Sequence, residues 1–225
     1  MIVQQLRAAE NKAGRPRDPD IEDRVYDAAI DIYSHAGWAG FNFAAISRAA
    51  GIGKNAMYRR WSSREDLLAD TLKARWISVE EIDTGYLRDD LLRLAMLFMT
   101  LLNGKYGSAQ VQMQADRLHF QEVRTATDDY FRQMVRLGRQ IVRRAVSRGE
   151  LPPQMSPTLI IDLVVGGATN HVMSTPPSLR SDMAARMDHF GAELVDAVLR
   201  GVSAEIPSPA TGGQPYPAAD FRTSR

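Results

Sequence analysis

Apolar residues recur every three or four positions through most of this chain, which is the period of an α-helix. The stretch from Asp20 to Ala36 is typical, because Ile21, Val25 and Ala28 fall on one helical face. The alternation of apolar and polar residues that marks a half-buried strand is nearly absent. The sequence therefore predicts an all-α protein.

The expected helices fall into two groups. Short helices come first, over residues 20–36, 43–50 and 54–61, followed by a helix that Ser62 or Ser63 caps. Longer, more apolar helices begin at Leu87 and are expected over residues 87–102, 108–120, 127–148, 156–172 and 179–201. We therefore predict about nine helices in two domains, 20–66 and 67–202, between a mobile basic arm over 1–19 and a disordered tail over 203–225.

Charge is balanced over the whole chain but not locally. The net charge is +1, yet no acidic residue occurs between Asp31 and Glu65, a stretch with one lysine and four arginines. The absence of cysteine excludes disulfides and thiolate sites. No signal peptide is recognisable, and the most apolar run, 159–168, contains Asp162 and is too short to cross a bilayer. A cytoplasmic protein that does not enter a membrane is expected.

The stretch AGIGKNAMYRRW, residues 50–61, combines glycines with basic residues and suggests a phosphate partner. A nucleotide-binding P-loop requires a preceding strand, a longer spacing between glycines, and Ser or Thr after the lysine. Here Asn55 follows Lys54, the two glycines are too close, and the preceding segment is helical. The sequence therefore excludes the P-loop interpretation.

Two short helices joined by a turn with Gly51 and Gly53 have the proportions of a helix-turn-helix, whose second helix enters the DNA major groove. Met57 and Trp61 are expected to anchor that helix in the core. Its outer face would carry hydrogen-bond donors and one aromatic ring, suited to phosphates and base edges, from Lys54, Asn55, Tyr58 and Arg59.

The segment AAIDIYSHAGWAGFNFAAISRAAGIGKNAMYRRWSSREDLLADTL, residues 28–72, resembles the TetR family of bacterial transcriptional regulators. The likeness lies in a glycine-ended first helix, an I-A-x-x-A-G-like second helix and a lysine-led recognition helix with an aromatic stop. Carried over by position, the resemblance implies double-stranded DNA as a partner and contacts by Asn42, Ala44, Lys54, Asn55, Tyr58, Arg59, Arg64, Arg15 and Arg17. Arg60 could instead pair with an acidic residue of the first helix, and the N-terminal arm could be unbound.

The resemblance also implies a homodimeric repressor that a small-molecule inducer releases from a palindromic operator. The last two helices are the expected dimer interface, with contacts by Leu159, Leu163, Gly167, Met187, Phe190, Leu194 and Val198. The alternative is that these side chains pack within one subunit.

Flexible and aromatic apolar residues on the middle helices suit either an ordinary core, which residue type alone favours at any one position, or a ligand pocket, which the few polar groups among them suggest. The expected pocket residues are Phe98, Leu102, Gln112, Met113, Asp116, His119, Phe131, Met134 and Asn170. Asp116 and His119 lie one helical turn apart and could instead belong, with His171, to a metal or catalytic site. No nucleophile motif accompanies them, so we expect neither catalysis, metal nor cofactor.

A second hypothesis for the whole chain is a helical small-molecule binding protein with weak or lost DNA affinity. It rests on Gly53 and Ala56, which stand where the family often has hydroxyl groups for capping and phosphate contact.

Overall fold

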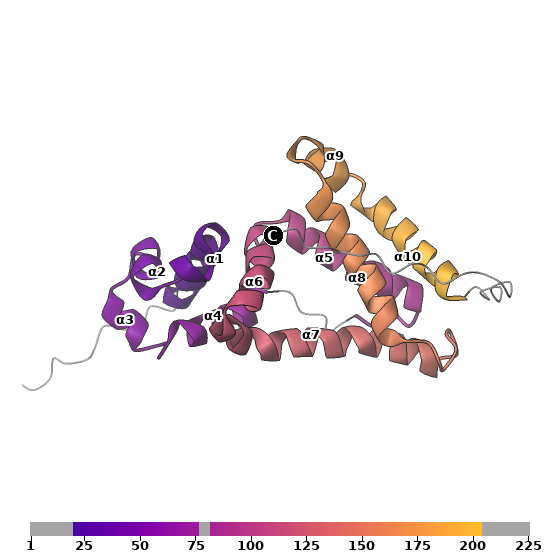
Figure 1. Ribbon diagram of the computed structural model, residues 1–225, viewed down its shortest axis with the longest axis horizontal. Coiled ribbons are helices and arrows are strands. Elements are labelled where there is room, and N and C mark those ends of the chain that lie inside the picture. Colours follow the sequence, from indigo (N-terminus) through magenta and orange to yellow (C-terminus); the bar gives the residue numbers. More distant parts are fainter. Residues whose placement is uncertain (1–19, 77–81, 204–225) are drawn as a thin grey trace, which may run out of the picture.

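A computed structural model describes residues 20–76 and 82–203, and the regular structure in those ranges is entirely helical (Figure 1). The described residues form ten α-helices and one short 3-10 helix. The all-α prediction is confirmed. None of the described helices is both long and apolar enough to cross a membrane.

The N-terminal part contains α1 (Ile21–Gly40), α2 (Phe43–Ala49), α3 (Lys54–Tyr58) and α4 (Arg64–Arg75). Local sequence explains where two of these helices begin. The Asn42 side chain accepts a hydrogen bond from the Ala45 N–H at 2.9 Å, and Ser63 accepts from the Asp66 N–H at 3.1 Å. Both are N-caps that satisfy a backbone donor left unpaired at a helix start.

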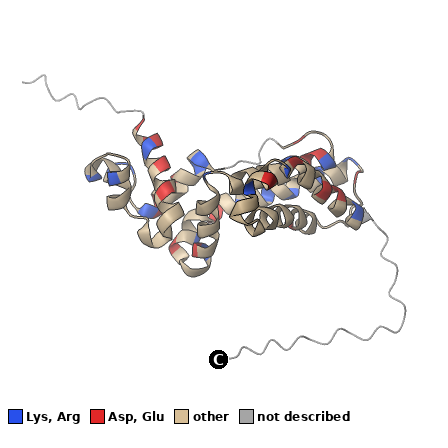
Figure 2. Ribbon diagram, turned by 90° about the horizontal axis from the view of Figure 1, so that it is seen from above, with Lys and Arg blue, Asp and Glu red and all other residues tan. Residues whose placement is uncertain are grey.

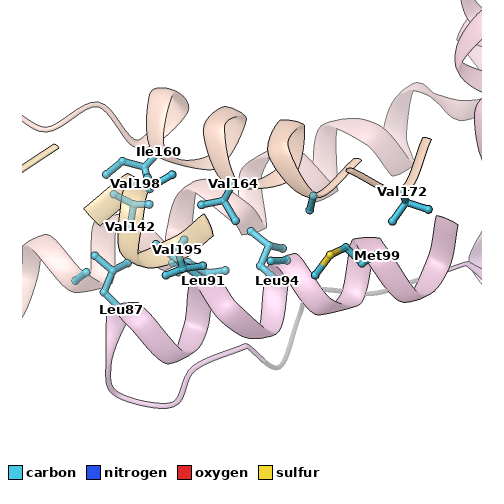
Figure 3. Close-up of a cluster of buried hydrophobic side chains, with 14 of the residues drawn as sticks. Leu87, Leu91, Leu94, Met99, Val142, Ile160, Val164, Val172, Val195 and Val198 are labelled. Carbon is cyan, nitrogen blue, oxygen red and sulfur yellow. The ribbon is translucent and has the colours of Figure 1, made fainter. Parts of the chain in front are cut away.

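The C-terminal part contains α5 (Leu87–Asn103), α6 (Gly107–His119), α7 (Gln121–Ser147) and α8 (Pro157–Ser174). A 3-10 turn (Pro177–Leu179), α9 (Arg180–Ala184) and α10 (Met187–Ser203) follow. Helix α5 packs against both α8 and α10. Their shared core consists mainly of aliphatic side chains, among them Leu91, Leu94, Val164 and Val195 (Figure 3).

A second core lies between α1, α2, α3 and α4, and it extends beyond them. Tyr33, Trp38 and Met57 are buried in it, and so are Met113 of α6 and Val123 of α7. Helix α1 packs along α6, while α4 packs on α7 (Figure 1). The two parts of the molecule therefore share packed side chains as well as a chain connection.

Gly37 interrupts α1 where the sequence predicted a stop, because its φ of +55° and ψ of −161° are not helical, and a short helical run to Gly40 follows the kink. Three other helix boundaries differ from the sequence prediction. Helix α3 ends at Tyr58. Helix α7 begins at Gln121 instead of residue 127. Its first turns contain β-branched residues, which lower helix propensity, but Val123 and Thr127 are buried against neighbouring helices and this packing stabilises the helical conformation. The expected last helix is divided, since the chain turns after α9 so that Met183 packs in the C-terminal core.

Candidate nucleic-acid interface and ligand cavity

The turn between α2 and α3 fixes the orientation of α3. Gly51 has φ +66°, a left-handed conformation that glycine adopts without steric cost, and the Ile52 N–H donates to the Ser47 carbonyl at 2.9 Å. Met57 and Trp61 are almost fully buried on the inner side. Helix α3 is therefore held against the core along one face only.

The opposite face of α3 is open to solvent. Lys54, Asn55, Tyr58 and Arg59 are exposed, and Tyr58 exposes 61% of its surface, a high value for an aromatic side chain. The Tyr58 ring packs edge-on against Phe43 of α2, with 5.0 Å between ring centroids. This contact fixes the direction in which the side chain projects. The end of the molecule that carries α2 and α3 shows basic segments (Figure 2).

The other residues predicted to contact DNA have different surroundings. Asn42 is exposed, but its side chain caps α2, and Ala44 is half-buried in the first turn of that helix. The Arg64 guanidinium stacks on the Trp38 ring at 3.8 Å and donates to the Trp38 carbonyl at 3.2 Å. These contacts give Arg64 a structural role at the end of α1. Arg15 and Arg17 lie outside the described residues.

Arg60 points away from the open face of α3. Its Nε lies 3.8 Å from Glu22 Oε1 of α1, so the alternative prediction of an ion pair with the first helix is confirmed.

Comparisons with known proteins agree with this geometry. Residues 25–71 match the family model described as bacterial regulatory proteins, tetR family, and residues 81–196 match the tetracyclin repressor-like C-terminal domain. The chain belongs to the TetR family. It is therefore a transcriptional regulator with a helix-turn-helix DNA-binding domain, and it is not an enzyme.

Similar individual proteins span nearly the same length as this TetR regulator. The transcriptional regulator AqdR of Rhodococcus erythropolis is 27% identical over 180 residues, which cover 80% of this chain and 85% of that protein. FadR from Bacillus subtilis, solved with stearoyl-CoA, is 16% identical with a TM-score of 0.62 over 80% of this chain and 98% of that one. Salmonella enterica GusR is 16% identical with a TM-score of 0.64, covering 82% and 96%. The two structural likenesses show the shared fold.

A largely apolar cavity of about 380 Å³ lies between α5, α6, α7 and α8 of the regulator. That volume falls within the range of about 300–1,000 Å³ that is typical of small-molecule sites. The expected pocket residues Phe98, Phe131 and Met134 line it. Sequence reasoning missed other lining residues, including Gln110, Gln114, Tyr130 and Val165, since nothing in their local pattern separates them from core or surface.

The remaining residues predicted for the pocket do not line this cavity. Leu102 and Met113 belong to the two cores, and His119 and Asn170 are exposed. Gln112 and Asp116 face the other side of α6, where they meet α1. The structure therefore brings three of the nine residues to the cavity. Of the described residues, no three histidine or acidic side chains come together as metal ligands.

Asp116 joins α6 to the DNA-binding part of the molecule. Its buried carboxylate accepts a hydrogen bond from the Trp38 N–H at 2.8 Å and another from the Gln112 amide at 3.1 Å. Burial, and then the negative charge of Asp116, raise the pKa of the neighbouring Tyr33 hydroxyl above its ordinary value. Hydrogen bonds inside a core require favourable distances and angles, so the bonds of Asp116 to Trp38 and Gln112, here called the α1–α6 joint, fix the position of α1 on α6.

The residues predicted for the dimer interface divide into two sets. Leu159 and Leu163 of α8 are exposed apolar side chains, 51% and 44% accessible. Gly167 instead contacts Leu194 of α10 so closely that an added Cβ would lie 2.7 Å from the leucine Cδ1, and Val198 is buried in the C-terminal core. Met187 and Phe190 are partly buried against that same core.

Proposed function

We propose that this TetR regulator is a homodimeric repressor, acting in the cytoplasm, that binds a palindromic operator and is released by a small-molecule inducer. The observation that carries the proposal is the open face of α3, whose donors project from a helix anchored on its other side. Such a helix fits the major groove, where Lys54, Asn55, Tyr58 and Arg59 would contact phosphates and base edges.

A homodimer is supported by the exposed leucines of α8. One helix-turn-helix makes few DNA contacts, so two copies on successive half-sites gain both affinity and specificity. Leu159 and Leu163 lie one turn apart, and their exposure on a folded chain is best explained by a second copy of α8. Leu159→Asp combined with Leu163→Asp is expected to give a monomer by light scattering. A dimer of unchanged mass would contradict this interface.

The route from ligand to DNA follows from the two sides of α6. Gln110 and Gln114 face the cavity, while Gln112 and Asp116 hold α1. A ligand that shifts α6 therefore shifts α1 and the recognition helix with it. The ligand acts only if it binds more tightly to the conformation whose recognition helices do not match the operator spacing.

The test is a gel shift with the DNA upstream of the regulator's own gene. Tyr58→Ala and Lys54→Ala are expected to lose operator binding while circular dichroism shows an unchanged fold, because both side chains are exposed. Tyr86→Ala is the matched control, since Tyr86 is 68% exposed and lies outside the DNA-binding part. Operator binding should also weaken with added salt.

Full binding by Tyr58→Ala and Lys54→Ala would sink the assignment of the α3 face. Absence of salt-dependent binding by the wild-type protein would favour the second function, a small-molecule binding protein without DNA affinity.

A further inference from the structure

Helix α7 carries a row of arginines that the DNA-binding function does not use. Arg132, Arg136, Arg139 and Arg143 follow at intervals of four, three and four residues, which places them on one face of the helix. With Arg117 of α6 they line a groove of about 410 Å³. Asp128 is the single acidic residue of that lining, so five arginines against one carboxylate leave a net charge of +4.

Most of this charge has no counterpart. Arg117 and Arg132 both pair with Asp128, at 3.2 and 3.0 Å. Within the ranges that the structure describes, Arg136, Arg139 and Arg143 form neither an ion pair nor a side-chain hydrogen bond. Three unpaired guanidinium groups in one groove repel each other and attract an anion, and their planar donors suit phosphate oxygens.

The arginine groove and the apolar cavity adjoin each other. Phe131 and Val135 line both spaces, one on each of two successive turns of α7. The Arg117 guanidinium lies over the Phe131 ring at 4.3 Å, so this ring contacts an arginine of the groove and also lines the apolar cavity. Asp162 is the one charged residue in the cavity lining. A ligand placed across Phe131 would have an apolar part inside and an anionic part outside.

The extent of the arginine row indicates the kind of anion. Residues 132 to 143 span about 17 Å of helix at 1.5 Å per residue, too far for one carboxylate to reach. A head group with more than one phosphate could contact Arg136, Arg139 and Arg143 together. The operator is a less suitable partner, because α7 runs from the α4 end toward the opposite end of the molecule from α3 (Figure 1).

We propose that the effector of this regulator is an apolar acyl chain carried on a phosphate-bearing head. The chain occupies the cavity beside Phe98 and Val165, and the phosphates bind the arginines of α7. The proposal rests on the proposed function in one respect, namely that the cavity is the effector site, and it adds the chemical class of the ligand and the residues that recognise its charge.

The experiment is calorimetric titration of the purified full-length protein with four probes. Decanoyl-CoA supplies chain and phosphates, CoA only the head, decanoate only the chain, and decyl phosphate a chain with one phosphate. Decanoyl-CoA is expected to bind at least about tenfold more tightly than CoA or decanoate, and to weaken with added salt. Decyl phosphate is expected to bind more weakly than decanoyl-CoA, and equally tight binding would contradict a head that reaches several arginines with more than one phosphate.

Two variants separate the head from the chain. Arg136→Gln combined with Arg139→Gln should weaken decanoyl-CoA and CoA by about tenfold or more per arginine, without affecting decanoate. Val165→Phe fills part of the cavity and should weaken decanoyl-CoA and decanoate, without affecting CoA. Arg124→Gln is the control, because Arg124 is an exposed arginine of α7 outside the groove.

The proposal is overturned if decanoyl-CoA binds no more tightly than decanoate, or if the double arginine variant keeps full affinity for it. If the double arginine variant changes only the mass of the dimer, the arginines of α7 contact a second copy of the chain. If it changes only operator binding, they contact DNA. Either result would also overturn the proposal. Operator gel shifts on the same samples keep the two proposals apart. A protein that binds the operator but not decanoyl-CoA rejects the ligand class alone. A protein that binds decanoyl-CoA but not the operator rejects the repressor function alone.

Discussion

Replacing Gly37 by alanine should destabilise the fold in two ways. It strains the backbone, and it disturbs the hydrogen bonds of Asp116 to Trp38 and Gln112, which form the α1–α6 joint. Gly37 has φ +55° and ψ −161°, a combination that is essentially restricted to glycine. A Cβ at this position would lie 2.8 Å from the Gln112 amide nitrogen and 3.0 Å from Asp116 Oδ2. The added methyl group would therefore strain the backbone and push Asp116 away from the Trp38 N–H.

The two costs can be estimated separately. The disfavoured conformation costs about 1–3 kcal/mol. Disturbing a buried hydrogen bond to a carboxylate costs about 1.5–3 kcal/mol more. Gly37→Ala should thus lower the free energy of unfolding by about 2.5–6 kcal/mol, a large part of the stability of an ordinary domain.

Gly51→Ala is the matched control. Gly51 also has a positive φ, of +66°, but a Cβ there would meet no atom within 4 Å. Only the conformational cost of about 1–2 kcal/mol remains. Urea unfolding followed by circular dichroism, at one fixed protein concentration because a dimer is proposed, should place the Gly37→Ala midpoint well below that of Gly51→Ala. Equal midpoints would refute the idea that the joint adds stability.

Two further predictions concern capping and pH. Asn42→Ala removes the N-cap of α2 and should lower the free energy of unfolding by about 1 kcal/mol, with a corresponding fall in melting temperature; an unchanged melting temperature would contradict the cap. Burial raises the folded-state pKa of Tyr33 above its unfolded value near 10, so its contribution to stability is complete below that pH and is lost as pH rises above it. Urea midpoints measured from pH 8 to 11 should therefore fall, and less steeply in Tyr33→Phe; identical slopes in both proteins would show that Tyr33 does not contribute.

Prediction from sequence succeeded where neighbours along the chain decide the outcome. The α2 cap at Asn42 and the turn at Gly51 depend on backbone groups a few residues away, and both occur as expected. The start of α7 was wrong for the opposite reason. Thr125 and Thr127 lower helix propensity locally, but burial of Val123 and Thr127 against other helices outweighs that preference.

The lining of the apolar cavity was predictable only in part. Phe98, Phe131 and Met134 were expected from residue type and do line the cavity. Asp116 was also expected there, because a carboxylate among apolar residues suggests a ligand contact. Its actual partner is the Trp38 N–H, which is 78 residues away in the sequence, and no local sequence pattern predicts such a hydrogen bond. The same holds for Arg64, which stacks on Trp38.

The sequence by itself determined that the chain is helical, the N-cap of α2 and the helix-turn-helix with its outward donors, since these depend on hydrogen bonds and apolar spacing within a few residues. Tertiary structure alone decided which side of α6 faces α1 and which faces the cavity. It also decided that Phe131 and Val135 border both the apolar cavity and the arginine groove. The physical reason is that a helix presents every face to its surroundings, and only the packing of distant helices determines which faces become core, cavity or surface.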